Sequence, residues 1–420
     1  MVAEVVLAGE VAGRWGPITG RWRLGACAGW RVTRRGRPET GEESKFGSMF
    51  RGLPLGPFPG AHRAMARLIG GHRKRMVEIA GQRILVTTSP KLIQVEQRPF
   101  PVLERLLINM LGDEQLGYFK GWLKIAYESL ASGTGRPGQA LVLAGPADSY
   151  KSLLQNLITQ ILGGRSAKPY RYMSGATDFN GDLFGAEHLM IEDDIGSCEI
   201  RTRRNFGTRI KEFTVNETQS CHPKNRPALS LTPFWRLTIS VNDEPENLLI
   251  LPPLDDSLMD KLILLKVAEQ PPLMPTVTRE ERLKFWQTLV NELPGFIWEL
   301  THWEIPAELQ GGRFGVHHFH HRELLQAIED SAPETKLLAI IDTAFKEGPL
   351  NKDTGFKGTA EELESKLTFA YPAETRRLCS WSNAVGTYLS RLADKHPDRV
   401  KQHRTATARL WEIEPPKAET

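Results

Sequence analysis

The stretch GPADSYKS places Lys151 and Ser152 where a phosphate-binding loop of the form G-x-x-x-x-G-K-[ST] has its lysine and its hydroxyl. Such a loop binds phosphate through backbone N–H groups at a helix N-terminus, and its lysine neutralises the β- and γ-phosphate charge. Tyr150 stands where the second glycine belongs, so this stretch alone fits a nucleotide site and a look-alike equally well. The positions that would surround the phosphates are Gly145, Pro146, Ala147, Asp148, Ser149, Tyr150, Lys151 and Ser152.

Two further groups of polar residues follow apolar runs that have the pattern of buried strands. HLMIEDDIGS contains Glu192, Asp193 and Asp194, and a nucleotide hydrolase needs one carboxylate for Mg²⁺ and another to activate water. WRLTISVNDEP ends its strand in Asn242, which can hold the attacking water against the γ-phosphate. The acidic group alone is better interpreted as a solvated turn, but the three elements in this order favour a nucleotide hydrolase.

Tyrosine at position 150 imposes two conditions on this interpretation. Its ring must point away from the nucleotide, because glycine at this place relieves crowding beside the phosphates. If the backbone needs a positive φ there, tyrosine costs on the order of 1 kcal/mol or more. We expect a domain of this size to tolerate that cost, although it would slow turnover.

An α/β domain must position these residues. From 141 to about 268, strand-like and helical stretches alternate, which is typical of a mainly parallel sheet. Helical patterns flank this region, from residue 100 before it and from TREERLKFW after it. The expected core strands are Leu141–Ala144, His188–Ile191, Trp235–Val241 and Leu262–Val267.

A basic hairpin is predicted between the acidic group and Asn242. Two strand-like runs surround the tip SCHPKNRPA, which carries His222, Lys224 and Arg226. Basic residues on such a tip would suit contact with a nucleic-acid backbone. Without its context, an ordinary polar turn is the simpler interpretation.

The segment from about 115 to 268 resembles a superfamily 3 helicase, the ring-forming AAA+ type used by viruses, phages and plasmids. AGPADSYKSLL is similar to the loop of papillomavirus replicative helicases, LMIEDD to their strand ending in two aspartates, and LTISVND to the strand ending in the sensor asparagine. The basic hairpin matches the pre-sensor hairpin, which in that family tracks DNA inside the ring. YFKGWLKIAYESL resembles the segment before the loop in phage and poxvirus-type primase–helicases.

The resemblance implies ATP and Mg²⁺ as cofactors and assigns roles to the central residues. Lys151 would bind the β- and γ-phosphates, and Ser152 would ligate Mg²⁺. Asp193 would hold the metal through water and Asp194 would polarise the attacking water, with Glu192 a rival for either carboxylate role. Asn242 would be the sensor. The residues that would touch DNA are His222, Lys224 and Arg226.

The resemblance also implies a basic finger that acts on a neighbouring subunit. PLDDSLMDKLILLKV carries Lys261 at that position, where arginine is usual. Lysine cannot make the planar two-point contact with phosphate that arginine makes. Arg209 and Arg236 are alternative candidates.

The C-terminal stretch WSNAVGTYLSRLADKHPDRVKQHRTATARLWEI predicts a helix with Val385, Leu389 and Leu392 inward, followed by two short strands. This is the order of a winged helix, and several phage-type primase–helicases end similarly. A small packing domain with a solvated basic face is the alternative. The residues that would contact duplex or origin DNA are Arg391, Lys395, Arg399, Lys401, His403 and Arg404.

Composition limits the other possibilities. Charged residues make up 25% of the chain and the net charge is only +4, so a nucleic-acid surface must come from local clustering. The 4 scattered cysteines argue against a zinc ribbon or a disulfide framework and suit a reducing cytoplasm. No run approaches the roughly 18 apolar residues of a membrane span. The histidines of RFGVHHFHHREL (His317, His318, His320, His321) fit a loop near DNA better than a metal site.

The sequence therefore predicts an AAA+ P-loop core (136–270) after a basic extension (1–85) and a helical lead-in (86–135). A helical segment (271–345) and a winged-helix-like domain (346–420) would follow. We expect a cytoplasmic, hexameric, ATP-dependent helicase or translocase on single-stranded DNA, and on origin duplex through the winged helix, with a separate primase or polymerase as partner. Alternatives are a hydrolysis-deficient DNA-binding scaffold or initiator, and a P-loop kinase or metabolic ATPase, which would show no salt-sensitive DNA binding.

Overall fold

The computed structural model of the chain describes residues 66–67, 71, 73, 75–79, 82–86, 89–192, 200–225, 227–252, 254–379, 381–405 and 408–416. The chain divides at residue 61, and the described residues all lie in the second unit, His62–Thr420. Three of the predicted site residues, Asp193, Asp194 and Arg226, lie outside the described residues.

The central sheet consists of β4 (Ala140–Ala144), β5 (Ser166–Ala167), β6 (His188–Glu192), β9 (Arg236–Val241) and β10 (Leu262–Lys266). The strands are parallel and lie in the order β10-β4-β9-β6-β5, which is 5-1-4-3-2 when they are counted along the chain. The strand that leads into the predicted phosphate-binding loop therefore lies between β10 and β9. The prediction of a parallel α/β sheet is confirmed.

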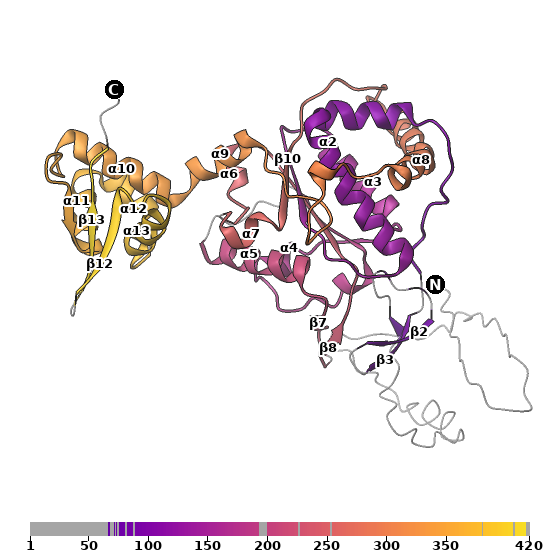
Figure 1. The fold of residues 1–420 in the computed structure, drawn as a ribbon, viewed down its shortest axis with the longest axis horizontal. Coiled ribbons are helices and arrows are strands. Elements are labelled where there is room, and N and C mark those ends of the chain that lie inside the picture. Colours follow the sequence, from indigo (N-terminus) through magenta and orange to yellow (C-terminus); the bar gives the residue numbers. More distant parts are fainter. Residues whose placement is uncertain are drawn as a thin grey trace, which may run out of the picture. The chain divides into compact units, whose positions relative to one another are not determined.

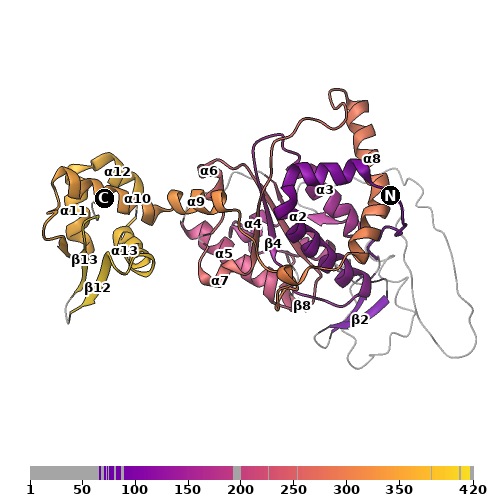
Figure 2. The ribbon, with the colours of Figure 1, turned by 45° about the horizontal axis from the view of Figure 1, so that its top comes forward.

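Alternate residues of the strands contribute to two hydrophobic cores, because helices cover both faces of the sheet. Leu141 and Leu143 belong to one core, and Val142 and Ala144 to the other. Figures 1 and 2 show the helices of the first core together on one side of the sheet. These helices are α2 (Pro101–Ser132), α3 (Lys151–Ile161) and α8 (Arg279–His302). The second core is covered by α4 (Tyr170–Met173), η1 (Leu183–Gly185), α5 (Ile200–Val215), α6 (Pro245–Leu248), α7 (Asp256–Met259) and α9 (Arg322–Ser331).

Helix α8 begins at a capping box that fixes where the chain turns back toward the sheet. The Glu281 N–H donates to the Thr278 hydroxyl at 3.1 Å, and the Thr278 N–H donates to the Glu281 carboxylate at 2.9 Å. Helix α2, the partner of α8 in this core, bends at Gly112, whose φ is 65°. The turn η2 (Ala307–Leu309) follows α8.

Two smaller sheets flank the central one. β1 (Ala66–Arg67), β2 (Arg75–Ile79) and β3 (Gln82–Val86) form a three-stranded sheet in the order β1-β3-β2. It is joined to the central domain at Gly71, whose N–H donates to the buried carboxylate of Glu187 at 2.8 Å. β7 (Gln219–Cys221) and β8 (Leu229–Leu231) pair antiparallel, as the predicted hairpin requires.

The C-terminal residues form a domain with its own hydrophobic core, which begins at Leu337. Its elements are α10 (Pro333–Glu347), β11 (Phe356–Gly358), α11 (Ala360–Ala370), α12 (Pro372–Leu378), α13 (Ala384–Lys395), β12 (Val400–Arg404) and β13 (Arg409–Ile413). The strands are antiparallel in the order β11-β13-β12, and Figure 2 shows the β12–β13 hairpin extending from the helices. Val385, Leu389 and Leu392 of α13 are buried, as predicted.

In the part of the chain that the structure describes, no helix is both long and apolar enough to cross a membrane.

Candidate functional site

The loop between β4 and α3 has the backbone that the sequence pattern predicts. The first residue of the loop must be glycine, because a Cβ on Gly145 would collide with the carbonyl oxygen of Val267. Asp148 and Tyr150 both adopt positive φ, at 58° and 63°. The chain thereby turns sharply and starts α3 directly at Lys151. A loop that leads into a helix N-terminus is the place where phosphate is bound in loops of this kind.

Tyr150 takes the left-handed conformation that glycine would adopt more easily, with φ 63° and ψ 14°. Its ring packs edge-on against Phe285 of α8, with 6.1 Å between ring centroids. Burial raises the pKa of its phenol, and a side-chain hydrogen bond with Thr276 lowers it by a smaller amount. The ring therefore points toward α8 and the segment before it. That the ring also points away from a bound nucleotide stays a prediction.

Lys151 is buried, and its ammonium group is held inside the loop. Its Nζ donates to the carbonyl oxygens of Gly145 at 2.7 Å and Pro146 at 2.5 Å, and it reaches Asn242 Oδ1 at 3.2 Å. Asn242 directly follows β9, the neighbour of β4 in the sheet. Two residues that the sequence predicts for one nucleotide site are thus in contact.

The acidic side of the site begins at the end of β6. Glu192 is the last residue of that strand and lies opposite Ser240 of β9, so it shares the carboxyl edge of the sheet with Asn242. Its carboxylate pairs with Lys168 at 2.8 Å. The side chain of Ser152, on the first turn of α3, is exposed. Asp193 and Asp194, which follow Glu192 directly, lie outside the described residues.

The three candidates for a basic finger lie on different elements. Lys261 directly precedes β10, at the amino end of the sheet, about 16 Å of strand from the phosphate-binding loop of its own chain. Its Nζ lies 2.6 Å from Asp260. Arg236 is buried at the amino end of β9, where burial lowers its pKa to about 10. Arg209 of α5 lies over the ring of Tyr172, with 4.3 Å from its guanidinium carbon to the ring centroid.

The tip of the β7–β8 hairpin is held by the loop that contains Asn180. The His222 N–H donates to Asn180 Oδ1 at 2.7 Å, the Asn180 N–H donates to the His222 carbonyl at 3.1 Å, and Asn180 Nδ2 donates to Ser220 at 2.9 Å. His222 and Lys224 are exposed at the tip. These hydrogen bonds therefore hold the backbone at the base of the tip, from which the basic side chains extend.

Phe179 is a residue of this surface that the sequence analysis missed. Its ring is 40% exposed and lies 5.2 Å from the ring of His222, between ring centroids. An exposed aromatic ring beside basic side chains offers a face on which a nucleobase can stack. The only signal in the sequence is a phenylalanine within the polar stretch TDFNGD, and that is too weak to identify without the fold.

Most of the basic residues predicted for the C-terminal domain are paired within it. Glu334, only 1% exposed, accepts from Arg391 at 3.2 Å and from Lys395 at 3.4 Å. Three further basic residues pair with acidic residues of the same domain: Arg399 with Asp342, Lys401 with Glu414 and His403 with Glu412. Arg404 is exposed and lies opposite Arg409 across the β12–β13 hairpin. Two arginines are therefore paired across this hairpin.

One residue of the histidine-rich segment contacts the backbone of β10. The Nε2 of His320 lies 3.2 Å from the carbonyl oxygen of Leu262, and burial lowers the pKa of this imidazole, with His318 contributing in the same direction. Within the described ranges, no group of three or more His, Cys, Asp or Glu residues is arranged to hold a metal ion.

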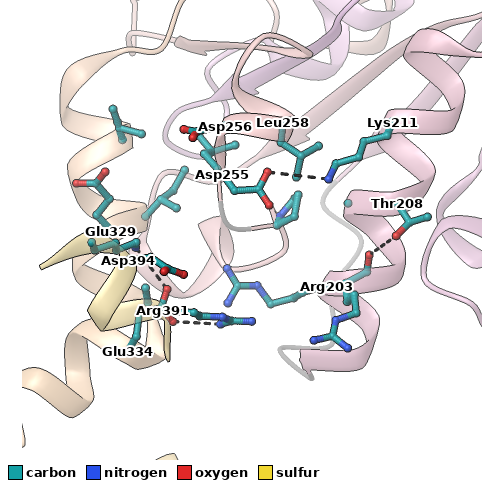
Figure 3. Close-up of a pocket in the computed structure, with 18 residues that line it drawn as sticks. Arg203, Thr208, Lys211, Asp255, Asp256, Leu258, Glu329, Glu334, Arg391 and Asp394 are labelled. Carbon is teal, nitrogen blue, oxygen red and sulfur yellow. Dashed lines mark hydrogen bonds and ion pairs between the residues drawn. The ribbon is translucent and has the colours of Figure 1, made fainter. Parts of the chain in front are cut away.

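A cavity of about 680 Å³ is lined by residues of α5, α7, α9, α10 and α13, and it contains none of the phosphate-binding loop. Figure 3 shows Arg203 and Lys211 of α5 on one side, Asp255 beside Lys211, and the Arg391–Glu334 pair on the other side. Its lining mixes basic and acidic groups, so it has no single preferred ligand charge.

No family model and no curated protein matches the chain. Among solved structures, the apo structure of the NrS-1 C terminal region (305-718) matches with a TM-score of 0.51 and 16% identity, over 84% of this chain and 85% of that one. An A form apo structure of the same region matches with a TM-score of 0.50 and 14% identity over the same shares. The chain shares that fold. A structure of JCV Helicase matches 55% of the chain at 14% identity, covering 67% of its own length, but its TM-score of 0.25 is too low to support an argument.

Proposed function

We propose that this chain is an ATP-dependent DNA helicase or translocase of the superfamily 3 kind, from a phage, virus or mobile element. In this proposal ATP lies between the subunits of a hexameric ring in the cytoplasm, and hydrolysis moves the basic hairpins along single-stranded DNA. A separate primase or polymerase would be its partner in replication.

The observation that carries the proposal is the contact between Lys151 and Asn242, at 3.2 Å. Residues of a nucleotide hydrolase must converge at the carboxyl edge of the sheet, because phosphate, metal and attacking water all have to meet there. Lys151 comes from the loop after β4, Asn242 from the end of β9 and Glu192 from the end of β6, and these three strands are neighbours in the sheet. A loop that only resembles a phosphate-binding loop would not be expected to lie at the same edge of the sheet as Asn242 and Glu192.

The described residues fit a nucleotide with Mg²⁺. The close approach of Gly145 to Val267 and the left-handed turn at Tyr150 give the loop its tight shape, and Lys151 supplies the positive charge. The exposed hydroxyl of Ser152 would ligate the metal, and Glu192 lies at the same edge of the sheet. Asp193, outside the described residues, is proposed to hold the metal through water. When bound, Mg²⁺ would neutralise phosphate charge. Asn242 would orient water, and Asp194 or Glu192 would accept its proton.

Single-stranded DNA is proposed to run over the tip of the β7–β8 hairpin. Lys224 and His222, with Arg226, would contact backbone phosphates, and Phe179 would stack against a base. The C-terminal elements follow one another as helix, strand, helices and two strands, which supports a winged-helix domain with its β12–β13 hairpin as the wing. Arg404, at this wing, would then contact duplex DNA.

The test is the rate of ATP hydrolysis with and without single-stranded DNA. We expect measurable turnover that DNA stimulates, and loss of at least tenfold in Lys151→Ala, since the lysine neutralises phosphate charge in the transition state. Lys352→Ala, at an exposed position of the C-terminal domain, should leave the rate unchanged.

The second candidate, a hydrolysis-deficient scaffold or initiator, is favoured by two observations. Tyr150 strains the loop, and the ammonium of Lys261 is buried beside Asp260. That protein would bind DNA and nucleotide without turnover. Absence of turnover in the wild-type protein, with DNA binding intact, would replace the helicase by this alternative.

A further inference from the structure

Four buried polar side chains form a closed ring of hydrogen bonds beneath the phosphate-binding loop. Gln155 Nε2 contacts Thr238 Oγ1 at 2.8 Å, and Thr238 Oγ1 contacts His188 Nε2 at 2.8 Å. His188 Nδ1 contacts Thr159 Oγ1 at 2.7 Å, and the Thr159 hydroxyl donates to the backbone carbonyl of Gln155 at 3.1 Å. The ring thus begins and ends at Gln155, one turn after Lys151 on α3.

The donors and acceptors of the ring can be satisfied in one direction. Thr238 Oγ1 accepts from the Gln155 amide, so its own hydrogen goes to His188 Nε2. The imidazole then carries its proton on Nδ1 and donates to Thr159, whose hydroxyl hydrogen goes to the Gln155 carbonyl. If the imidazole proton were on Nε2 instead, Nε2 would donate to Thr238 Oγ1. The hydrogen of the Thr238 hydroxyl would then have no acceptor among the described residues of the ring. The ring therefore requires a neutral histidine in the Nδ1–H tautomer.

The orientation of Gln155 is fixed by β6. Besides Thr238, its Nε2 donates to the carbonyl oxygen of Ile191 at 3.2 Å. An amide turned the other way would place Oε1 against that carbonyl, and two acceptors repel. Among the described residues Oε1 has no hydrogen-bond partner, so the side chain is held by its donors alone. Ile191 directly precedes Glu192, so the bond reaches the backbone immediately before the acidic edge.

Stability alone gives little reason for a polar ring here. Gln155, His188 and Thr238 are fully buried, on the faces of α3, β6 and β9 that pack together. Burying polar groups costs free energy that hydrogen bonds roughly offset, whereas apolar side chains of similar shape would pack without that cost. Hydrogen bonds depend on direction, whereas apolar contacts do not, so the ring holds α3 in one register along the strands.

We propose that Gln155, His188 and Thr238 are positioning residues for the nucleotide reaction. The ring holds α3 in one register against β6 and β9, so Lys151 and Ser152 at the start of α3 stay aligned with Glu192 and Asn242 at the ends of those strands. This inference rests on the proposed function, because it assigns the ring to the reaction of that site. The three residues touch no reacting atom and act through the elements that carry the reacting groups.

The test compares Thr238→Val with Thr238→Ser. Valine keeps the shape of threonine and removes the hydroxyl, whereas serine retains it. We expect Thr238→Val to lower kcat for ATP about tenfold with KM changed less than twofold, since misalignment penalises the transition state more than binding. Thr238→Ser should recover most of the rate. Equal kcat in Thr238→Val and the wild type, or equal loss in both variants, would overturn the inference.

A second variant and thermal unfolding show whether a loss of rate comes from a folding defect. Gln155→Met keeps the length of the side chain and removes the amide donors, and thermal unfolding of each variant shows whether the domain is intact. We expect amide hydrogen exchange in Lys151–Ile161 to be faster in Gln155→Met and Thr238→Val than in Thr238→Ser. Unchanged exchange in folded variants would overturn the positioning role.

The wild-type protein separates failure of this inference from failure of the proposed function. Nitrogen-15 NMR of His188 should show the Nδ1–H tautomer whether or not the protein hydrolyses ATP. Absence of turnover with that tautomer present would overturn the proposed function, and the exchange experiment would still decide the positioning role. The Nε2–H tautomer, or a charged imidazole at neutral pH, would overturn the ring itself.

Discussion

The Nζ of Lys151 lies 3.2 Å from the Oδ1 of Asn242, a contact between residues 91 positions apart in the sequence. Lysine has three N–H donors, and two carbonyl oxygens of the loop, those of Gly145 and Pro146, accept from the same nitrogen. A phosphate that enters the loop must displace some of these partners. If Lys151 binds phosphate as proposed, its contact with Asn242 would be among those that the nucleotide breaks, and the asparagine would then respond to the nucleotide.

Substitutions at Asn242 should separate binding from turnover. We expect Asn242→Ala to lower kcat at least tenfold and to change the affinity for Mg²⁺–ADP little, because its proposed task is to orient water. Asn242→Asp should weaken Mg²⁺–ADP binding, since a carboxylate beside Lys151 forms an ion pair that phosphate must break. Calorimetric titration and steady-state kinetics measure the two effects. Stronger nucleotide binding in Asn242→Asp would contradict this account of the contact.

The left-handed backbone at Tyr150 can be tested with a matched pair of variants. Tyr150→Gly and Tyr150→Ala both remove the ring from Phe285, but alanine retains the cost of positive φ. We expect Tyr150→Gly to be more stable than Tyr150→Ala by about 1 kcal/mol in urea unfolding. Tyr150→Phe should resemble the wild type, apart from the loss of the bond to Thr276. Equal stability of the glycine and alanine variants would mean that the backbone carries no strain.

The sequence predicted the parts of the fold that follow local patterns. Short apolar runs identified four of the five central strands, and the loop, Glu192 and Asn242 were found because each follows such a run. β5 was missed because Ser166–Ala167 is too short to show a pattern. The strands β2 and β3 were missed because both fall almost entirely within the stretch predicted as a basic extension, 1–85.

Partners distant in the sequence were not predictable. Nothing in the sequence pairs Tyr150 with Phe285, or Glu334 with Arg391 and Lys395, because these contacts depend on how helices pack. The two basic residues of α13, Arg391 and Lys395, are predicted to contact DNA, and the sequence did not indicate that both also pair with a buried carboxylate. Phe179 likewise acquires meaning only from its place beside His222.

The hairpin tip should bind single-stranded DNA through two separable contributions. Lys224→Ala should reduce affinity and lower the slope of log affinity against log salt by about 0.7, because one phosphate contact is lost. Phe179→Ala should cost about 1–3 kcal/mol with the salt slope unchanged, because stacking releases no counterions. Fluorescence anisotropy at several salt concentrations measures both. Lys352→Ala serves as the control, and a salt slope that falls in Phe179→Ala would argue against stacking.

The stability of the C-terminal domain should depend on the charge of Glu334. Burial alone would raise its pKa, but a backbone hydrogen bond and the cations of Arg391 and Lys395 lower it below the ordinary value of 4.5. A lowered carboxyl pKa stabilises the fold above pH 4.5, and this stabilisation is lost as pH falls through the folded-state pKa. Glu334→Gln should cost about 1–3 kcal/mol at pH 7, because the partly exposed cations lose their buried partner.

The control for this prediction is Glu374→Gln, at an exposed position of α12. Its unfolding free energy at pH 7 should stay within about 0.5 kcal/mol of the wild type. Denaturant unfolding of the full chain from pH 7 to pH 3, followed by a probe in the C-terminal domain, gives both curves. A Glu334→Gln variant as stable as the wild type at pH 7 would show that the two ion pairs contribute nothing.

His188 should make the central domain sensitive to mild acid. Burial lowers the pKa of this imidazole from 6.5 to about 3, so between these values the unfolded chain binds a proton that the folded chain excludes. Stability is therefore unaffected above pH 6.5 and falls below it by about 1.4 kcal/mol per pH unit from this residue. Unfolding of the central domain between pH 7 and pH 4.5 measures the slope. His188→Asn should be less stable at pH 7, because it breaks the ring, yet it should show a shallower slope. His317→Asn, at an exposed histidine, should keep the wild-type slope. If the slope survives in His188→Asn, the acid sensitivity comes from other groups and the imidazole is not held neutral by its burial.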